Sequence, residues 1–361
     1  MKENVLERME RIDAKTKIAN FQVKMQMPYE FKVSYARIRA LEFAHECERR
    51  GLNYHVSVGG LDSITLLLFL RKLGIDPPAI SVSFLEDVSI QAVHRQLGVE
   101  RLKPVKCPDG TYWNKTKVIQ QCGFPVLSKE LAAKIELLQH PSEKNVTVRH
   151  AIITGETGEY GGNQKHSRMK MSQKWLDKFG GADDEGKALG YQEAPFLVSS
   201  KCCYYLKERP CDLWAKEHNS VPYLGLMASE GGRRAKSLKI NGCNYFGAST
   251  IRSAPFAIFQ RQDILQLALD LNVPVPEIYG EIVRDEDGML RTTKAQRTGC
   301  SMCGFGVHLE SRPNRFDLLR QSNPKEWEFL MYHLCVDADG NEYGWARVLD
   351  YIGVPVVYEE V

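Results

Sequence analysis

Short β-rich runs alternate with amphipathic segments along most of this chain. Residues 54–58 (YHVSV) form a β-rich run that ends at two glycines, and the apolar run 62–74 follows directly. Residues 35–51 repeat apolar side chains at helical spacing and end on a glycine, which is typical of a helix with a glycine stop. The predicted strands are 54–58, 78–87, 149–158 and 221–228. The predicted helices are 35–51, 62–74, 89–98, 129–138 with Ser128 as its N-cap, and 260–272.

This alternation predicts an α/β fold, in which a mostly parallel sheet is sandwiched by helices. Three regions follow from the pattern: an N-terminal helical segment over 1–50, an α/β domain over 51–285, and a C-terminal region over 286–361. Within the α/β domain, residues 156–197 are rich in Gly, Lys, Asp and Gln. We predict that they form an insertion.

Composition narrows the class of protein. The 361 residues carry 48 Lys and Arg against 45 Asp and Glu, so the net charge of +3 does not indicate a polybasic nucleic-acid binder. No apolar run approaches membrane-spanning length, so we expect no membrane contact. The charged N-terminus does not resemble a secretory signal, and a cytoplasmic location is expected. A homo-oligomer is compatible with the sequence.

The turn between the run 54–58 and the run 62–74 is a candidate binding site. Gly59 and Gly60 allow a tight turn with exposed backbone N–H groups, and Asp62 is predicted to cap the helix that starts near Ser63. A helix N-terminus favours an anion. The spacing matches neither a Walker A motif nor a GxGxxG motif. Two interpretations remain open here: a phosphate cradle and a plain strand–helix turn.

The cysteines form a second candidate site. A Cys-Cys pair and a distant C-x-x-C supply four thiols, which suit zinc or an iron–sulfur cluster. Adjacent cysteines point apart in regular structure and fit a wider cluster more easily than one small ion. Buried structural thiols are the alternative, because free cysteine is often buried. The candidate ligands are Cys202, Cys203, Cys300 and Cys303, with Cys243 as an alternative ligand.

The glycine turn carries a family resemblance. VGGLDS, residues 58–63, resembles the SGG-x-DS loop of the PP-loop ATP pyrophosphatases, also called adenine nucleotide α-hydrolases. The resemblance implies an adenine nucleotide α-hydrolase-like fold over 51–285 and a loop that holds the phosphates or sulfate of an adenine nucleotide. Val58 stands where serine is usual, although Ser57 precedes it. The implied nucleotide-binding residues in this loop are Ser57, Gly59, Gly60, Asp62 and Ser63.

A Cys-Cys pair, the segment GLMASEGGRR, a Pro-Phe dipeptide and a C-x-x-C follow one another along the chain. This order resembles one branch of the superfamily, the phosphoadenylyl-sulfate (PAPS) reductase family, and within it the prophage-type members. That resemblance implies that the four cysteines ligate one [4Fe-4S] cluster, with a cysteine-rich cluster-binding region at the C-terminal end. The segment GLMASEGGRR, 225–234, loosely resembles an anion-contacting segment of the family and implies Arg233 and Arg234 as nucleotide contacts. ATP or adenylyl sulfate would be the nucleotide.

The resemblance implies an enzyme of sulfur metabolism, served by an electron donor or a sulfur donor. The reductases carry a C-terminal E-C-G-L-H tail, whereas the last cysteine here is Cys335 in a different context. Thiol chemistry needs an exposed thiolate, and no catalytic nucleophile is assigned. The first alternative is an ATP-dependent thiolation or phosphorothioation-like enzyme acting on nucleic acid. The second is a non-catalytic, cluster- or zinc-bearing module of a mobile-element complex.

Overall fold

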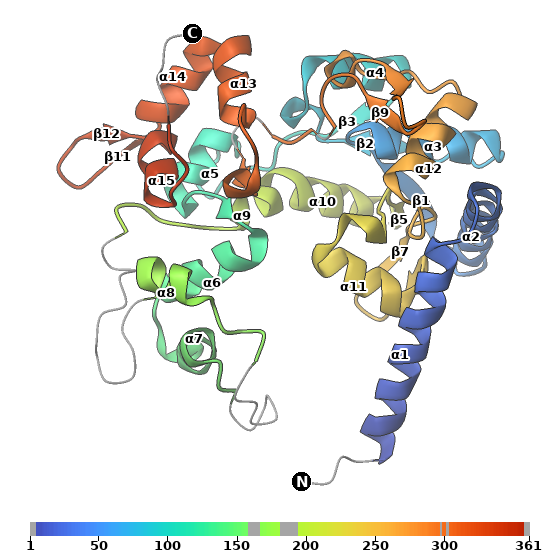
Figure 1. Cartoon of the computed structure of the whole chain (residues 1–361), viewed down its shortest axis with the longest axis horizontal. Helices are drawn as coiled ribbons and strands as arrows, with labels where there is room; N and C mark the ends of the chain where they lie inside the picture. The colour runs from blue at the N-terminus through green and yellow to red at the C-terminus, as the bar shows by residue number, and fades with distance from the viewer. Residues whose placement is uncertain (1–4, 158–166, 181–193, 297, 301–302, 357–361) are drawn as a thin grey trace. The chain divides into compact units, whose positions relative to one another are not determined.

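The computed structural model describes residues 5–157, 167–180, 194–296, 298–300 and 303–356 (Figure 1). The chain divides into two compact units. Unit 1 consists of Met1–Lys103 and Pro210–Gly299, and unit 2 consists of Pro104–Arg209 and Cys300–Val361. This division differs from the predicted regions 1–50, 51–285 and 286–361, because each unit combines two segments that are distant in sequence.

Unit 1 contains a six-stranded sheet within its described residues. In spatial order the strands are β3 (Glu100–Arg101), β2 (Ala79–Ser81), β1 (Asn53–Ser57), β5 (Ser220–Tyr223), β7 (Ile251–Ser253) and β6 (Asn244–Phe246). Neighbouring strands pair in parallel, except that β6 lies antiparallel to β7 at one edge. The predicted α/β class, with a mostly parallel sheet flanked by helices, is confirmed.

The helices of unit 1 surround this sheet. They are α1 (Val5–Met25), α2 (Tyr29–Arg49), α3 (Leu61–Lys72), α4 (Val88–Gln96), α10 (Arg209–Glu217), α11 (Gly232–Asn241) and α12 (Arg261–Asp270). Short 3-10 turns are η1 (Ser83–Leu85), η6 (Ala228–Glu230) and η7 (Glu277–Tyr279), and a hairpin is formed by β8 (Ile282–Arg284) and β9 (Leu290–Thr292). The predicted helices 35–51, 62–74, 89–98 and 260–272 correspond to α2, α3, α4 and α12.

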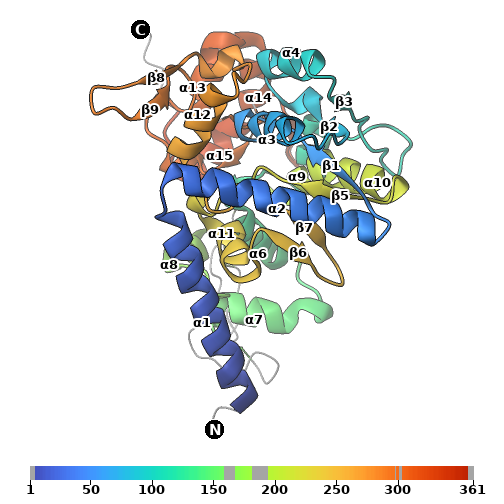
Figure 2. The ribbon, with the colours of Figure 1, turned by 90° about the vertical axis from the view of Figure 1, so that its right-hand side faces the viewer.

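Side chains of the central strand contact helices on both faces of the sheet, and α2 crosses one face in Figure 2. Tyr54 and His55 are consecutive in β1, so their side chains point to opposite faces. The Tyr54 ring contacts Tyr223, which packs at 4.9 Å against Phe43 of α2. The His55 ring lies 5.2 Å from Trp214 of α10. Full burial of a ring such as Phe43 contributes about 1.5–3 kcal/mol.

The buried His55 makes unit 1 sensitive to acid. Its Nδ1 lies 2.8 Å from the Ser220 hydroxyl. Burial, with a smaller contribution from His218, lowers the pKa of His55 to about 4. An unfolded histidine has a pKa of about 6.5, so the unfolded chain binds this proton more readily. Stability is therefore complete above about pH 6.5 and falls as the pH drops towards 4.

We expect the free energy of unfolding of unit 1 to fall by about 2 kcal/mol between pH 7.5 and pH 5 because of His55. Urea titrations at several pH values, followed by tryptophan fluorescence, measure this slope. His55→Gln keeps a hydrogen-bonding side chain but does not titrate, so its slope should be flatter. Equal slopes for the two proteins would contradict the prediction.

Unit 2 is mainly helical in its described part. Its elements are α5 (Lys115–Cys122), β4 (Val126–Leu127), α6 (Lys129–Gln139), η2 (Glu143–Asn145), α7 (Val146–Thr154), α8 (Gln173–Phe179), α9 (Lys201–Cys203), the π-helix η5 (Tyr204–Glu208), β10 (Gly304–Phe305), η8 (Val307–Leu309), α13 (Arg315–Ser322), α14 (Pro324–Tyr332), β11 (Cys335–Val336), β12 (Glu342–Tyr343) and α15 (Trp345–Tyr351). Across both units, no helix in the described ranges combines the length and apolar character needed to cross a membrane.

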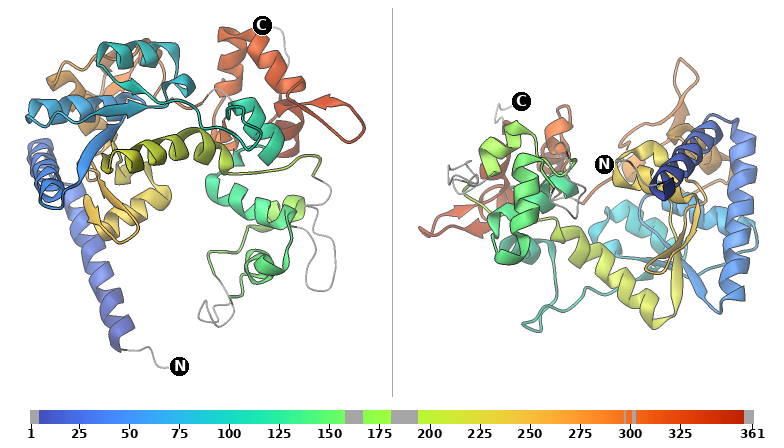
Figure 3. Two further views of the ribbon diagram at one scale, coloured as in Figure 1. Left: turned by 180° about the vertical axis from the view of Figure 1, so that it is seen from behind. Right: turned by 90° about the horizontal axis from the view of Figure 1, so that it is seen from below.

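The two chain segments of unit 2, green and red in Figure 3, share one hydrophobic core. β10 pairs in parallel with β4, so the second segment adds a strand to the first. The ring of Trp345 packs edge-on at 5.1 Å against Phe124 and lies 5.1 Å from Phe316. Gly304 lies so close to the Trp345 ring that any side chain there would collide with it. This packing holds the residues that follow Cys300 against those that precede Cys203.

Two predictions for unit 2 need correction. Residues 149–158 were predicted as a strand, but α7 is a helix that ends at Gly155, a left-handed cap with φ of 85°. Ala151 and Ile152 of this helix are buried, and Ile152 belongs to the core of unit 2. The predicted insertion 156–197 is only partly described, since 158–166 and 181–193 lie outside the described residues. Its described part contains α8, whose Phe179 is fully buried and contributes to the core.

Candidate functional site

The glycine turn, residues 57–63, joins β1 to α3 at a central position in unit 1. β1 lies between β2 and β5. β2 and β3 extend the sheet on one side of β1, and β5 and β7 extend it on the other, so the strand order reverses at β1. In open α/β sheets, ligands bind outside the carboxyl ends of the strands at such a switch point. The turn follows the carboxyl end of β1, so the fold places it where a ligand is expected.

Hydrogen bonds within the turn define its shape. The Gly59 N–H donates to the Ser63 hydroxyl at 2.7 Å, and that hydroxyl donates to the Gly60 carbonyl at 2.9 Å. His94 Nε2 lies 2.8 Å from the Gly59 carbonyl, and its Nδ1 lies 3.0 Å from the Ser83 hydroxyl. Because a carbonyl only accepts, Nε2 carries the proton. Burial lowers the pKa of His94, which favours this neutral form.

The loop after β5 packs tightly against the start of α3. A Cβ atom on Gly225 would lie 3.1 Å from the carbonyl carbon of Asp62 and from the backbone of Ser63. Only glycine fits this approach without movement of the neighbouring backbone. The loops that follow β1 and β5 therefore meet at the first turn of α3.

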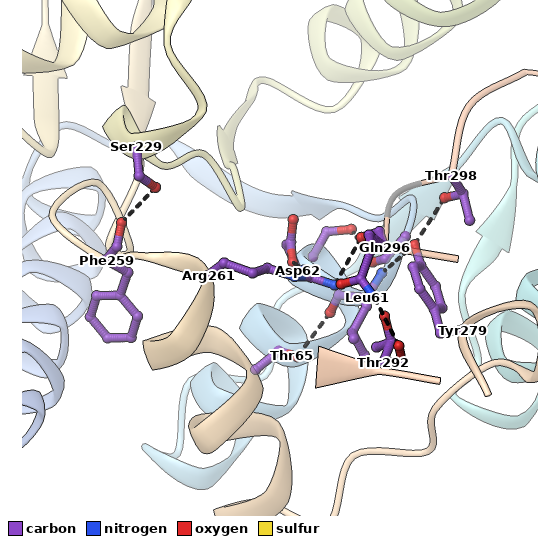
Figure 4. Close-up of polar contacts among 12 residues, drawn as sticks. Leu61, Asp62, Thr65, Ser229, Phe259, Arg261, Tyr279, Thr292, Gln296 and Thr298 are labelled. Atoms are coloured by element: carbon purple, nitrogen blue, oxygen red, sulfur yellow. Dashed lines mark hydrogen bonds and ion pairs between the residues drawn. The ribbon is translucent and has the colours of Figure 1, made fainter. Parts of the chain in front are cut away.

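Asp62 does not cap α3, which corrects the predicted role. The helix begins at Leu61 with Gly60 as its N-cap and without a side-chain cap bond. Instead, Asp62 pairs with Arg261 of α12 at 2.6 Å, and the same guanidinium donates to the Gln296 carbonyl at 3.1 Å (Figure 4). Arg261 therefore offsets the negative charge that Asp62 would present to an anion. Within the described residues, its Nε is buried without a hydrogen-bond partner.

The other predicted nucleotide-binding residues, Ser57, Arg233 and Arg234, lie in β1 and in α11. Ser57 ends β1 and is partly buried, while Val58 is only 5 % exposed and packs in the core. Val58 therefore packs in the core and offers no hydroxyl to a ligand. Arg233 and Arg234 lie in the first turn of α11, but their side chains are outside the described part of the chain.

The four-thiol group, Cys202, Cys203, Cys300 and Cys303, lies within unit 2. Burial raises the pKa of Cys202, and the other three thiols add to this electrostatically. Burial also raises the pKa of Cys203 and of Cys303, and each of them interacts with Cys300. The Cys303 N–H donates to the Cys300 carbonyl at 3.0 Å, which closes the C-x-x-C turn. These electrostatic interactions connect thiols that are about 100 residues apart in sequence.

Cations surround the four-thiol group. Lys115 acts on Cys202, and Lys129 acts on Cys203 both electrostatically and through a side-chain hydrogen bond. Arg315 of α13 donates to the Cys303 carbonyl at 3.0 Å and interacts with its thiol. These positive charges favour the thiolate form, whereas burial opposes it. Burial is the larger effect, so the pKa values of Cys202, Cys203 and Cys303 remain raised.

The backbone around the Cys-Cys pair departs from regular α-helix. α9 ends at Cys203 and continues directly into the π-helix η5, which leads into α10. π-helical turns are rare and occur frequently at functional sites. The Tyr205 ring in this turn stacks at 4.3 Å on Trp113. Aromatic packing therefore fixes the turn that presents the adjacent cysteines.

Four cysteine thiols are the donor type that suits an iron–sulfur cluster or zinc. Across the described residues, however, no three His, Cys, Asp or Glu side chains are arranged around one metal ion. All ten cysteines are free. Cys243, the alternative ligand, instead lies in the core of unit 1 with 2 % exposure, and it is hydrogen-bonded with Tyr35.

Sequence reasoning missed Arg261, His94 and Tyr279 at the glycine turn. Tyr279 accepts a hydrogen bond from the Leu61 N–H at 3.2 Å. These residues lie far from the turn in sequence, and none belongs to the quoted loop motif. Arg261 lies in the first turn of the predicted helix 260–272, where an arginine gives no specific indication of a binding site. Comparison with protein-family models, curated proteins and solved structures gave no match.

Proposed function

We propose that this chain is an adenine-nucleotide-binding iron–sulfur enzyme of sulfur metabolism, related to the PAPS reductase family. The glycine turn of unit 1 binds the phosphates of ATP or the sulfate end of adenylyl sulfate. The four-thiol group of unit 2 holds a [4Fe-4S] cluster. The observation that carries the proposal is the electrostatic interaction of Cys202 with Cys203, Cys300 and Cys303 within one unit.

Support for nucleotide binding comes from the sheet order and the turn. A PP-loop nucleotide site of the adenine nucleotide α-hydrolase type requires a glycine turn after a central parallel strand, and β1 has that position. α3 is twelve residues long, so its N-terminal amides carry a favourable dipole for phosphate. The Arg261–Asp62 pair limits repulsion between Asp62 and the incoming anion.

Support for the cluster comes from donors and charge. Cys202, Cys203, Cys300 and Cys303 would hold it, and a bound cluster would supply electron transfer or positive electrostatics. Four thiolates carry more negative charge than the iron offsets, and Lys115, Lys129 and Arg315 are placed to compensate it. Zinc remains the competing metal for this set.

One observation favours ATP-dependent sulfur transfer over sulfonucleotide reduction. Reduction by the family's tail cysteine needs an exposed thiolate with a low pKa. Cys335 is 8 % exposed and burial raises its pKa to about 11, so it does not offer such a thiolate. We therefore favour adenylation of an acceptor oxygen by ATP with release of pyrophosphate, followed by attack of a sulfide-level sulfur donor that displaces AMP. Nucleic acid is the candidate acceptor.

Anaerobically purified protein tests this proposal. We expect it to contain iron and sulfide and to bind ATP in equilibrium dialysis. We also expect pyrophosphate release from ATP in the presence of RNA or DNA, and no sulfite release from labelled adenylyl sulfate. Sulfite release would instead assign reduction. Absence of binding to both nucleotides would reject the proposal.

Gly59→Asp places a negative charge in the glycine turn and is expected to weaken ATP binding by about tenfold or more. A Cβ on Gly59 has ordinary space, 3.7 Å from Glu86 and 3.9 Å from Ser63, so the variant can fold. Gly59→Ala adds the same Cβ without the charge. The ratio of their dissociation constants, measured by calorimetry, isolates the charge, and a ratio near one would contradict phosphate binding at this turn.

A further inference from the structure

A short segment of unit 1 lies against the glycine turn. Arg261 bonds the Gln296 carbonyl, and the Gln296 side chain donates to the Thr292 carbonyl at 2.8 Å. The Lys294 N–H donates to the Tyr279 carbonyl at 3.0 Å. The residues after β9 are thereby attached both to α12 and to η7. This arrangement places Thr298 and Tyr279 beside Gly60.

The Tyr279 hydroxyl occupies a distinctive position in this arrangement. It accepts from the Leu61 N–H at 3.2 Å and shares a 2.9 Å hydrogen bond with the Thr298 hydroxyl (Figure 4). A Cβ on Gly60 would collide with the same oxygen. The side chain is only 3 % exposed. An oxygen atom of the protein therefore lies directly against the backbone of the glycine turn.

Protein hydroxyls thus accept from both amides that flank Gly60. Ser63 accepts from Gly59, and Tyr279 accepts from Leu61, the first residue of α3. An amide at a helix N-terminus is where the oxygen of a bound anion is expected. Burial raises the pKa of Tyr279, so the group in this position is a neutral phenol. Hydrogen bonds to charged acceptors are roughly twice as strong as those to neutral ones.

We propose that the Tyr279 hydroxyl is an intramolecular competitor for the phosphate position at the glycine turn, held there by Thr298. In the nucleotide-free protein it satisfies the Leu61 amide. A phosphate oxygen replaces it on binding, because the charged acceptor makes the stronger bond. Tyr279 and Thr298 therefore lower the affinity for any anion that binds the Leu61 amide. This inference rests on the proposed nucleotide site.

Removing the hydroxyl should tighten ATP binding. In Tyr279→Phe, the free protein loses the partner of the Leu61 amide, while the bound state loses nothing that phosphate does not supply. One net hydrogen bond of about 1 kcal/mol corresponds to an affinity gain of about fivefold. The melting temperature without nucleotide should fall, and the rise on adding ATP should be larger than in the wild type. Calorimetry with ATP and with inorganic pyrophosphate measures the affinities.

Two further variants control the interpretation. Tyr223→Phe removes another buried hydroxyl of unit 1, which donates to the Ala40 carbonyl at 2.7 Å. It should lower the melting temperature without changing ATP affinity. Thr298→Val keeps the Tyr279 ring but removes its second partner, so it should tighten binding by a smaller factor, about twofold. It also serves if Tyr279→Phe does not fold.

The outcomes separate this inference from the proposed function. Tighter binding in Tyr279→Phe and Thr298→Val, but not in Tyr223→Phe, supports the competitor role. Unchanged or weaker binding in both variants, with an intact wild-type affinity that Gly59→Asp lowers, overturns the inference alone. Failure of the wild type to bind ATP or pyrophosphate overturns the proposed function, and the competitor role is rejected with it.

Discussion

Cys303→Ser is expected to remove most of the iron from the anaerobically purified protein. The wild type should contain about four iron and four sulfide per chain, as a [4Fe-4S] cluster requires. Cys303 interacts with Cys203 and Cys300, so its loss removes one of four donors. Serine is nearly the same size but does not provide a soft thiolate. Iron and sulfide analysis, with the absorbance near 400 nm, measures the loss.

Cys335→Ser is the matched control for that experiment. Cys335 lies in the same unit and is similarly protonated, with a pKa raised to about 11 by burial, but it belongs to the hairpin strand β11. Its substitution should leave the iron content unchanged. A colourless wild-type protein with zinc and no iron would contradict the cluster. Equal iron loss in both variants would show that general destabilisation, and not ligand removal, causes the loss.

Lys32→Met is expected to destabilise unit 1 by about 3–5 kcal/mol. The Lys32 ammonium on α2 lies 2.7 Å from the Asp263 carboxylate on α12, and the two residues are 4 % and 8 % exposed. The same carboxylate accepts from the Gln260 N–H at 2.7 Å. Removing the cation leaves a buried carboxylate without its counter-charge. Urea unfolding followed by tryptophan fluorescence measures the change.

Surface and double variants give the comparison. Lys17 pairs with Asp13 on α1 with more than half of both side chains exposed, so Lys17→Met should change stability by less than about 1 kcal/mol. Lys32→Met combined with Asp263→Leu removes both charges and should recover part of the loss. A loss in Lys32→Met no larger than in Lys17→Met would contradict the predicted role of the buried pair.

Elements with a strong local pattern could be predicted from the sequence. The run 54–58 and the helix 62–74 correspond closely to β1 and α3, because a β-rich run, two glycines and a long apolar helix are each defined by adjacent residues. Ser128 caps α6 as its position predicted, accepting from the Leu131 N–H. The prediction of a strand at 149–158 is wrong. The same apolar run can form a helix or a strand, and here the buried face of α7 and its cap at Gly155 accompany a helix.

The residues of the two candidate sites could be predicted from the sequence to different degrees. The Cys-Cys and C-x-x-C spacing identified four thiols that lie in the same unit and interact electrostatically. Each pair is local in sequence, whereas the interaction between the pairs depends on the tertiary structure. The glycine turn was also visible as a motif. Arg261 and Tyr279 were not, because they reach the turn from about 200 residues further along the chain. The predicted cap Asp62 became an ion-pair partner for the same reason.

By itself, the sequence determined the α/β class, the position of the glycine turn between a strand and a helix, and the identity of the four thiols. Each of these depends on residues that are neighbours in the chain. Only the tertiary structure decided the division into two units, the neutral form of His94, and the hydrogen bond from the Leu61 N–H to the Tyr279 hydroxyl. Those features arise from burial and from contacts between distant segments, and no local pattern encodes them.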